Sequence, residues 1–214
     1  QTSEASVTYI NSIFDAAKTI GEEIAARLGS QEMTREELDN YLLRSLEVAR
    51  NSVPPIIAVV TAWEPGKGPE TKLAYFVNNE SRLVAGANYD VHEWYKSTRD
   101  TKTARWQEPF IGEFVPEPIA VYTVPIFRKD KAGEDVLVGV LAIDISIDFL
   151  KGTVSSIPVS NSGFAMILSS RNVPVAYPKA VAGGKTADEM KVRELVGGDL
   201  ADFDRSVKKA KGLI

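Results

Sequence analysis

The segment Val136-Leu137-Val138-Gly139-Val140-Leu141-Ala142-Ile143-Asp144-Ile145-Ser146 decides the fold of this 214-residue chain. Its apolar, β-branched composition predicts the strongest strand of the sequence, in the centre of a sheet. Side chains alternate between the two faces of a strand. One face therefore carries Leu141, Ile143 and Ile145, and the other carries Ala142, Asp144 and Ser146.

Asp144 is the most informative residue of this strand, because it places a carboxylate among valine and alanine side chains. A buried carboxylate is costly unless a cation or hydrogen-bond donors satisfy it. Two interpretations remain open from the pattern. In one, Asp144 pairs with an internal arginine or caps backbone amides. In the other, its partner is the amine of a bound ligand.

Further strands follow from the same kind of pattern. β-branched and apolar runs bounded by turn residues predict strands at residues 56–63, 73–77, 109–114 and 119–128. Residues 129–134 contain a glycine and form a hairpin connection to the strand at 136–146. After Pro158, residues 163–169 and 173–177 predict a second, separate hairpin, which helices at 186–196 and 200–211 would follow.

Two helices are predicted before the first strand. Residues 1–30 form one long helix, because apolar residues recur at steps of three and four along one seam. Thr34 begins a second helix, and Glu37 completes a capping box with it. A short helix is expected at residues 149–154. These elements predict an α+β fold, with a long N-terminal helix packed on one antiparallel, PAS-like sheet.

Residues 82–105 are polar and of mixed charge, and they predict a loop with a helical turn. Aromatic residues within and after this segment are candidates for a pocket wall, because ligand pockets are mostly apolar with a few converging polar groups. The alternative is that each aromatic side chain simply covers the core. The candidates are Trp94, Tyr95, Trp106, Phe110 and Tyr122.

Composition excludes several kinds of site. The chain has no cysteine, which excludes disulfides, a cysteine nucleophile and a thiolate zinc site. Its net charge is −4, which argues against nucleic-acid binding. His92 is the only histidine, so one chain cannot build a multi-histidine metal site. Asp90, His92 and Glu93 are neighbours in sequence and rarely converge on one ion, which favours a solvated loop.

No catalytic constellation emerges either, so we expect no enzyme, no cofactor and no metal. Gly66-Lys67-Gly68 and Gly183-Gly184-Lys185 lack the spacing of a phosphate-binding loop and predict turns. No apolar run reaches the roughly 18–20 residues that span a bilayer. The sequence starts at Gln1, which indicates a piece of a longer protein.

Together these residues resemble the double-Cache sensor domains of bacterial membrane receptors. The resemblance runs from the first helix to Pro178, and several short segments carry it in order. They are Trp94-Tyr95, Trp106-Gln107-Glu108-Pro109-Phe110, Tyr122-Thr123-Val124-Pro125-Ile126, residues 139–150, residues 163–168 and Val175-Ala176-Tyr177-Pro178.

The resemblance implies an extracytoplasmic small-molecule sensor of a histidine kinase, chemoreceptor or similar receptor, held between transmembrane helices outside this chain. It implies packing and stalk helices in residues 1–50, a membrane-distal ligand-binding module in 51–158 and the start of an incomplete membrane-proximal module in 159–214. The long helix would make the contact of a homodimer. The alternative is a protein-interaction or structural domain of the same fold without a small ligand.

The resemblance also bears on the ligand. Amino-acid-binding members resemble this chain at Trp94, Tyr95 and Asp144, but His92 stands where they have an arginine for the ligand carboxylate. Gly112 stands where they have a second aspartate. A neutral histidine cannot replace the bidentate guanidinium fork, so we expect a standard α-amino acid to bind poorly. A small amine, a compact carboxylate held by another cation, or an uncharged metabolite remains open.

Overall fold

The computed structural model describes residues 3–69, 72–77, 80–85, 89–112, 117–157, 165–169, 171 and 174–176. The chain divides into two compact units, residues 15–146 and residues 1–14 with 147–214. We call the first the sheet unit. The predicted helices at 186–196 and 200–211, and the turn at Gly183-Gly184-Lys185, lie outside the described residues.

Two long helices come first, as predicted. α1 runs over Ser3–Ser30 and α2 over Arg35–Ser52. The capping box at the start of α2 is confirmed, since the Thr34 hydroxyl accepts from the Glu37 backbone N–H while the Glu37 carboxylate accepts from the Thr34 N–H. The buried face of α2 consists of Leu38, Leu42, Leu46 and Ala49.

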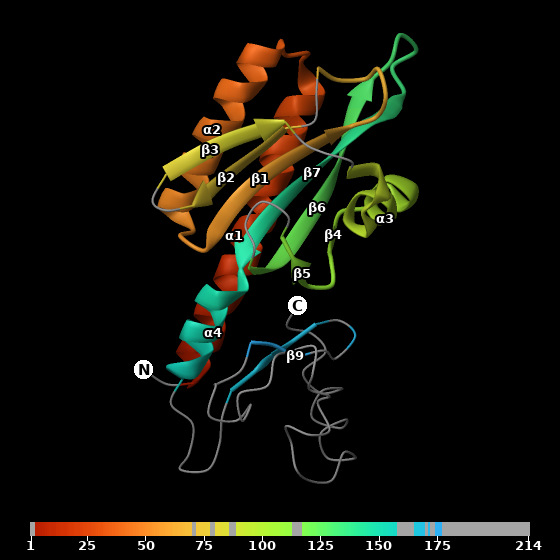
Figure 1. The fold of residues 1–214 in the computed structure, drawn as a ribbon. Helices are drawn as coiled ribbons and strands as arrows, with labels where there is room; N and C mark the ends of the chain where they lie inside the picture. The colour runs from red at the N-terminus through yellow and green to blue at the C-terminus, as the bar shows by residue number, and fades with distance from the viewer. Residues whose placement is uncertain are drawn as a thin grey trace. The chain divides into compact units, whose positions relative to one another are not determined.

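The sheet unit is built on a seven-stranded antiparallel sheet. Its order is β3 (Glu80–Ala85), β2 (Lys72–Val77), β1 (Ile56–Trp63), β7 (Asp135–Ser146), β6 (Pro118–Lys129) and β4 (Arg105–Trp106), with β5 (Phe110–Ile111) also paired to β6. The predicted central strand is thus confirmed, because β7 lies between β1 and β6 (Figure 1).

Helices cover the two faces of this sheet unequally. α1 and α2 lie behind the sheet in the view of Figure 1. α1 packs closely there, since a Cβ added at Gly21 would lie 3.2 Å from Ile143 Cγ1 and 3.4 Å from Val124 Cγ2. The opposite face is covered by α3 (Glu93–Thr101), which follows the 3₁₀ turn η1 (Tyr89–Val91). We call these the α1 face and the α3 face.

The prediction of a loop for residues 82–105 is wrong in two respects. Residues 80–85 form β3, which pairs only with β2. An edge strand keeps polar side chains in water and so lacks the apolar signal of a central strand. Residues 93–101 form α3, a full helix whose buried residues are only Tyr95 and Thr98. Two buried positions on nine residues are too few for periodicity to reveal a helix.

Smaller differences concern the strands that flank β6. Among the described residues of the predicted strand at 109–114, Phe110 and Ile111 pair with β6, and the Gly112 N–H donates to the Glu117 carbonyl. The two-residue β4 is not predicted at all. Strands this short are held by tertiary pairing rather than by their own sequence pattern.

The second unit contains α4 (Ile147–Ser155) and the antiparallel pair β8 (Ile167–Leu168) and β9 (Pro174–Ala176). The short helix and the second hairpin are therefore confirmed within the described residues. The module boundaries at residues 50, 158 and 159 stay a prediction. No helix among the described residues is long and apolar enough to cross a bilayer.

Candidate functional site

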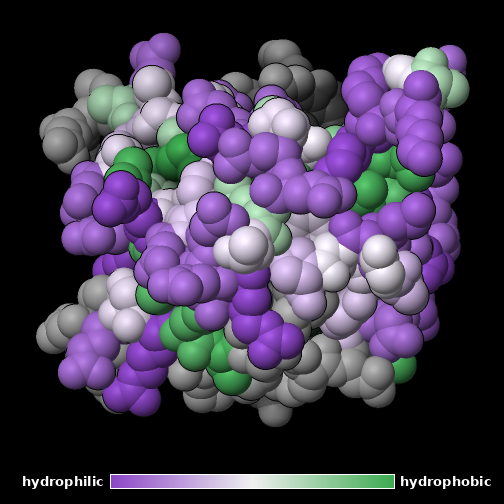
Figure 2. All heavy atoms as spheres, turned by 90° about the horizontal axis from the view of Figure 1, so that it is seen from above, coloured by the Kyte–Doolittle hydropathy of each residue, from purple (hydrophilic) through white to green (hydrophobic). Residues whose placement is uncertain are grey.

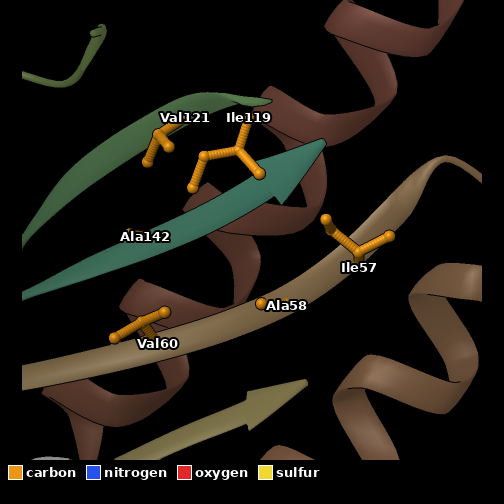
Figure 3. Packing of buried hydrophobic residues seen from close by; sticks show 6 residues of the cluster. All are labelled: Ile57, Ala58, Val60, Ile119, Val121 and Ala142. Carbon is orange, nitrogen blue, oxygen red and sulfur yellow. The ribbon is translucent and has the colours of Figure 1, made fainter. Parts of the chain in front are cut away.

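Asp144 lies near the end of β7, between β1 and β6. Its Cα partners across the ladder are Ala58 on one side and Val121 on the other. Residues directly opposite in an antiparallel pair share a face, so the Asp144 side chain lies between an alanine and a valine on the α3 face. Figure 3 shows these two residues within the apolar cluster of that face, with a helix behind the sheet.

The carboxylate of Asp144 is buried and has no partner among the described residues. The residue is 8% exposed, and within the described part of the chain no arginine, lysine or backbone amide forms a hydrogen bond or ion pair with it. Burial raises the pKa of the Asp144 carboxyl from 3.8 to about 7. The first interpretation from sequence, an internal arginine or backbone amides, finds no support among the described contacts.

Aromatic side chains cover the apolar cluster around Asp144. Trp94 and Phe110 pack against the cluster that includes Ala58 and Val121, the two neighbours of Asp144. Trp94 also makes an edge-to-face contact with Tyr95, with 5.9 Å between ring centroids. The arrangement combines nearby aromatic side chains with a carboxylate that has no partner among the described residues, which is the chemistry that attracts a cation.

A polar network holds α3 in place over the sheet. The Thr98 and Thr123 hydroxyls lie 2.6 Å apart, and Gln107 Nε2 donates to Thr123 Oγ1 at 2.8 Å. The Ser97 hydroxyl donates to Gln107 Oε1 at 3.1 Å. Sequence reasoning missed these positioning residues. Thr123 could have indicated this network from the sequence, because it is a polar residue at an inward position of the predicted strand at 119–128.

Tyr95 anchors the other side of α3. The residue is 2% exposed, and its hydroxyl donates to Glu64 at the end of β1. Burial and the Glu64 carboxylate raise the pKa of the Tyr95 hydroxyl far above its usual value. Tyr95 packs against Ala62 and Val140 rather than against the neighbours of Asp144, so its position is that of an anchor for α3.

The remaining candidates are His92, Trp106 and Tyr122. His92 is the residue before α3, two positions before Trp94, and its side chain does not cap the helix. Trp106 and Tyr122 lie on the α1 face, with 5.1 Å between ring centroids. The Tyr122 hydroxyl donates to Glu22 Oε1 of α1 at 3.0 Å. The structure therefore does not bring Trp106 and Tyr122 together with Asp144, although Tyr122 and Asp144 lie on the neighbouring strands β6 and β7 and Trp106 lies on β4, which pairs with β6.

Metal ligands do not converge in the described ranges. No group of three or more histidine, aspartate or glutamate side chains there is arranged to hold a metal ion. Asp144 is accordingly a single carboxylate, which suits one positive charge rather than a coordination sphere.

Comparison with known proteins identifies the fold. No protein-family model matches the sequence, and no curated protein matches it. Among solved structures, the ligand-binding domain of the Campylobacter jejuni chemoreceptor Tlp3, in complex with 4-methylisoleucine, matches 89% of this chain and 69% of its own. Its TM-score is 0.62 at 16% identity.

Two other solved structures match as well. The extracellular domain of a protein described as a histidine kinase, mmHK1S-Z2, has a TM-score of 0.64 at 22% identity, over 91% of this chain and 78% of that one. A methyl-accepting chemotaxis protein X has a TM-score of 0.66 at 18% identity, over 82% and 72%. These matches confirm the α+β fold expected from the double-Cache resemblance. The chain has the fold of the sensory, ligand-binding domains of chemoreceptors and histidine kinases.

Proposed function

We propose that this chain is the extracytoplasmic sensing domain of a transmembrane receptor, and that it binds a small organic amine at Asp144. The observation that carries the proposal is the buried carboxylate of Asp144, which has no partner in the described part of the chain. A carboxylate in such a place is stabilised by a cation that enters the site with few waters. An ammonium group of a ligand is a cation of this kind.

The surroundings of Asp144 support an amine over other ligands. Trp94 and Phe110 present aromatic rings to the same cluster, and an ammonium group gains from contact with such rings. A free carboxylate or phosphate would meet the negative charge of Asp144. An uncharged ligand would leave that charge unpaired, so it gains less from the site.

The amine we propose lacks an α-carboxylate. The resemblance implies that amino-acid-binding relatives hold the ligand carboxylate with an arginine at the position of His92. His92 offers no bidentate fork, so a carboxylate next to the amine is desolvated without full compensation. The proposed ligand therefore differs in class from 4-methylisoleucine, the compound bound in the Tlp3 structure.

The proposed output is mechanical and involves no catalysis. Ligand binding on the α3 face would shift the long α1 helices of a homodimer, linked to the membrane by flanking helices outside this chain. A ligand shifts such an equilibrium only as far as its affinities for the two arrangements differ.

A matched series of four-carbon compounds tests the ligand class. n-Butylamine is norvaline without its carboxylate, while butyrate and n-butanol keep the alkyl chain without the amine. Calorimetry at pH 8 should give the tightest binding for n-butylamine. Asp144→Asn should weaken it by at least about 30-fold, because an unpaired partner of a buried ion pair costs several kcal/mol.

Asp135→Asn is the matched control, because Asp135 starts the same strand but is exposed and paired with Lys129. It should leave n-butylamine affinity unchanged. Tighter binding of norvaline than of n-butylamine would refute the ligand class. If neither n-butylamine nor norvaline binds, the sensing site at Asp144 is refuted and a protein-interaction domain of the same fold becomes the better proposal.

A further inference from the structure

A pocket lies in the sheet unit, away from Asp144. It has a volume of about 210 Å³ and lies where the loop after α1, the turn after β1 and the end of β6 meet. This is the end of the sheet from which the β6–β7 hairpin extends in Figure 1. Trp63 lines it, and Trp63 alternates in β1 with Ala62, which packs under Tyr95 on the α3 face. The pocket therefore belongs to the α1 face.

The size and walls of this pocket limit its ligand. Pockets for drug-sized ligands measure about 300–1,000 Å³, so this smaller pocket suits a molecule of only a few carbon atoms. Leu28, Met33 and Trp63 supply apolar wall, while Lys67, Arg128 and Glu32 supply charges. The surface seen from above in Figure 2 is mainly hydrophilic and has only small apolar patches. A pocket with apolar walls beside charged groups therefore differs from most of this surface.

Arg128 has hydrogen-bonding capacity to spare. Its guanidinium carries five N–H groups. Nη1 donates to Glu32 Oε1 at 3.1 Å and to the Lys67 carbonyl at 3.4 Å, and Nη2 donates to the Leu28 carbonyl at 3.4 Å. Bonds of 3.4 Å are weak. Within the described residues, Nε is buried without an acceptor and the second N–H of Nη2 has none either.

The charges of the pocket favour an anion. Arg128 and Lys67 are positive, and Lys67 is exposed, with no ion pair among the residues that the structure describes. Among the described residues of the lining, Glu32 is the single acidic one. Its side chain is 84% exposed, so its pairing with Arg128 is weakly held and open to exchange.

We propose that this pocket binds a small organic carboxylate. The ligand carboxylate replaces Glu32 on the Arg128 guanidinium, which is a planar group suited to bidentate carboxylate binding. Lys67 adds a second positive charge, and the alkyl chain of the ligand packs against Trp63 and Leu28. This site is independent of the amine site, because the two lie on opposite faces of the sheet and attract opposite charges.

The three tryptophans of the chain allow both sites to be followed separately. In 5-fluorotryptophan-labelled protein, fluorine NMR gives one resonance each for Trp63, Trp94 and Trp106, assigned by single Trp→Phe variants. Titration with sodium butyrate should shift the Trp63 resonance in a saturable way, while sodium chloride at equal ionic strength should not. Trp94 should stay unshifted by butyrate and move with n-butylamine.

Two charge variants test the roles of the pocket residues. Glu32→Gln removes the competing carboxylate and should tighten butyrate binding about two- to fivefold, and Lys67→Met should weaken it by a similar factor. Glu47→Gln, an exposed change on the far part of α2, should have no effect. Asp144→Asn should also leave butyrate affinity unchanged, which separates this proposal from the amine site.

The proposal fails if butyrate leaves the Trp63 resonance unmoved in both the wild-type protein and Glu32→Gln. It also fails if the Trp63 shift saturates with the same dissociation constant in the wild-type, Glu32→Gln and Lys67→Met proteins, since the charges of the pocket would then play no part in binding.

Discussion

The two faces of the central sheet differ in how their polar side chains are paired. On the α1 face, the Tyr122 hydroxyl on β6 donates to Glu22 of α1, which lies 100 residues away in the sequence. On the α3 face, an aspartate without a partner in the described part of the chain lies among apolar side chains. The first arrangement holds a helix against the sheet, and the second leaves a charge to be satisfied by something else. Close packing of α1 on one face and a buried charge on the other thus separate the centre of the α1 face from the proposed amine site.

The pH dependence of stability is the largest expected effect, and it tests whether the α3 face buries the Asp144 carboxyl. The Asp144 carboxyl in the unfolded chain loses its proton near pH 4, whereas the folded protein holds it to about pH 7. The unfolded state therefore binds fewer protons between these values, and stability falls as pH rises through that window. The loss amounts to up to roughly 4 kcal/mol.

Urea unfolding of the wild-type protein and Asp144→Asn at pH 4 and pH 8 measures this contribution. The stability of the variant relative to the wild type should increase as pH rises, because asparagine has no charge to bury. A stability difference that is the same at both pH values would show that the α3 face carries no buried charge, and the contrast between the faces would disappear.

The pH dependence of amine binding is the next largest effect. n-Butylamine stays protonated across this range, and it needs the ionised form of Asp144. Its affinity should therefore fall about tenfold for each pH unit below 7. Calorimetry at pH 5, 6, 7 and 8 gives the profile. A flat profile would mean that Asp144 does not pair with the amine.

Gly29 tests how tightly the α1 face is packed. A Cβ at this position would collide with the backbone carbonyl oxygen of Phe127, which cannot move aside as a side-chain end can. Gly29→Ala should therefore destabilise the protein by about 1–3 kcal/mol. Thermal unfolding measures the loss.

Gly152→Ala in α4 is the matched control, since no described residue lies within 4 Å of the added methyl group. Alanine is a better helix former than glycine, so this variant should gain about 0.5–1 kcal/mol. If both glycine variants changed stability in the same direction, the close approach of α1 to β6 would be wrong.

Tyr122→Phe has the smallest expected effect, and it tests whether Tyr122 on the α1 face contributes to stability without contributing to amine binding. It removes one hydrogen bond to Glu22, which is worth about 1 kcal/mol. Burial raises the pKa of the Tyr122 hydroxyl to about 12, so this bond has the same strength at pH 5 and pH 8. Denaturant unfolding should show the loss at both values, with n-butylamine affinity unchanged. A weaker affinity would place Tyr122 in the amine site.

Local signals in the sequence predicted most of the fold. The a/d pattern of residues 1–30, the Thr34–Glu37 capping box and the alternation in residues 136–146 each depend on neighbours a few positions apart. β3 and α3 were missed because their pattern is polar, and only pairing with β2 or packing on the sheet makes them regular.

The sequence by itself determined the central strand, the long helices and the position of a carboxylate that requires a partner, because these depend on alternation and spacing along the chain. The tertiary structure alone decided which candidates share a face. It joined Trp94 and Phe110 to the surroundings of Asp144 and placed Trp106 and Tyr122 behind the sheet. It also brought Leu28, Lys67 and Arg128 around one pocket. Strand register and helix packing bring together residues up to 100 positions apart, and a local sequence pattern cannot predict such a contact.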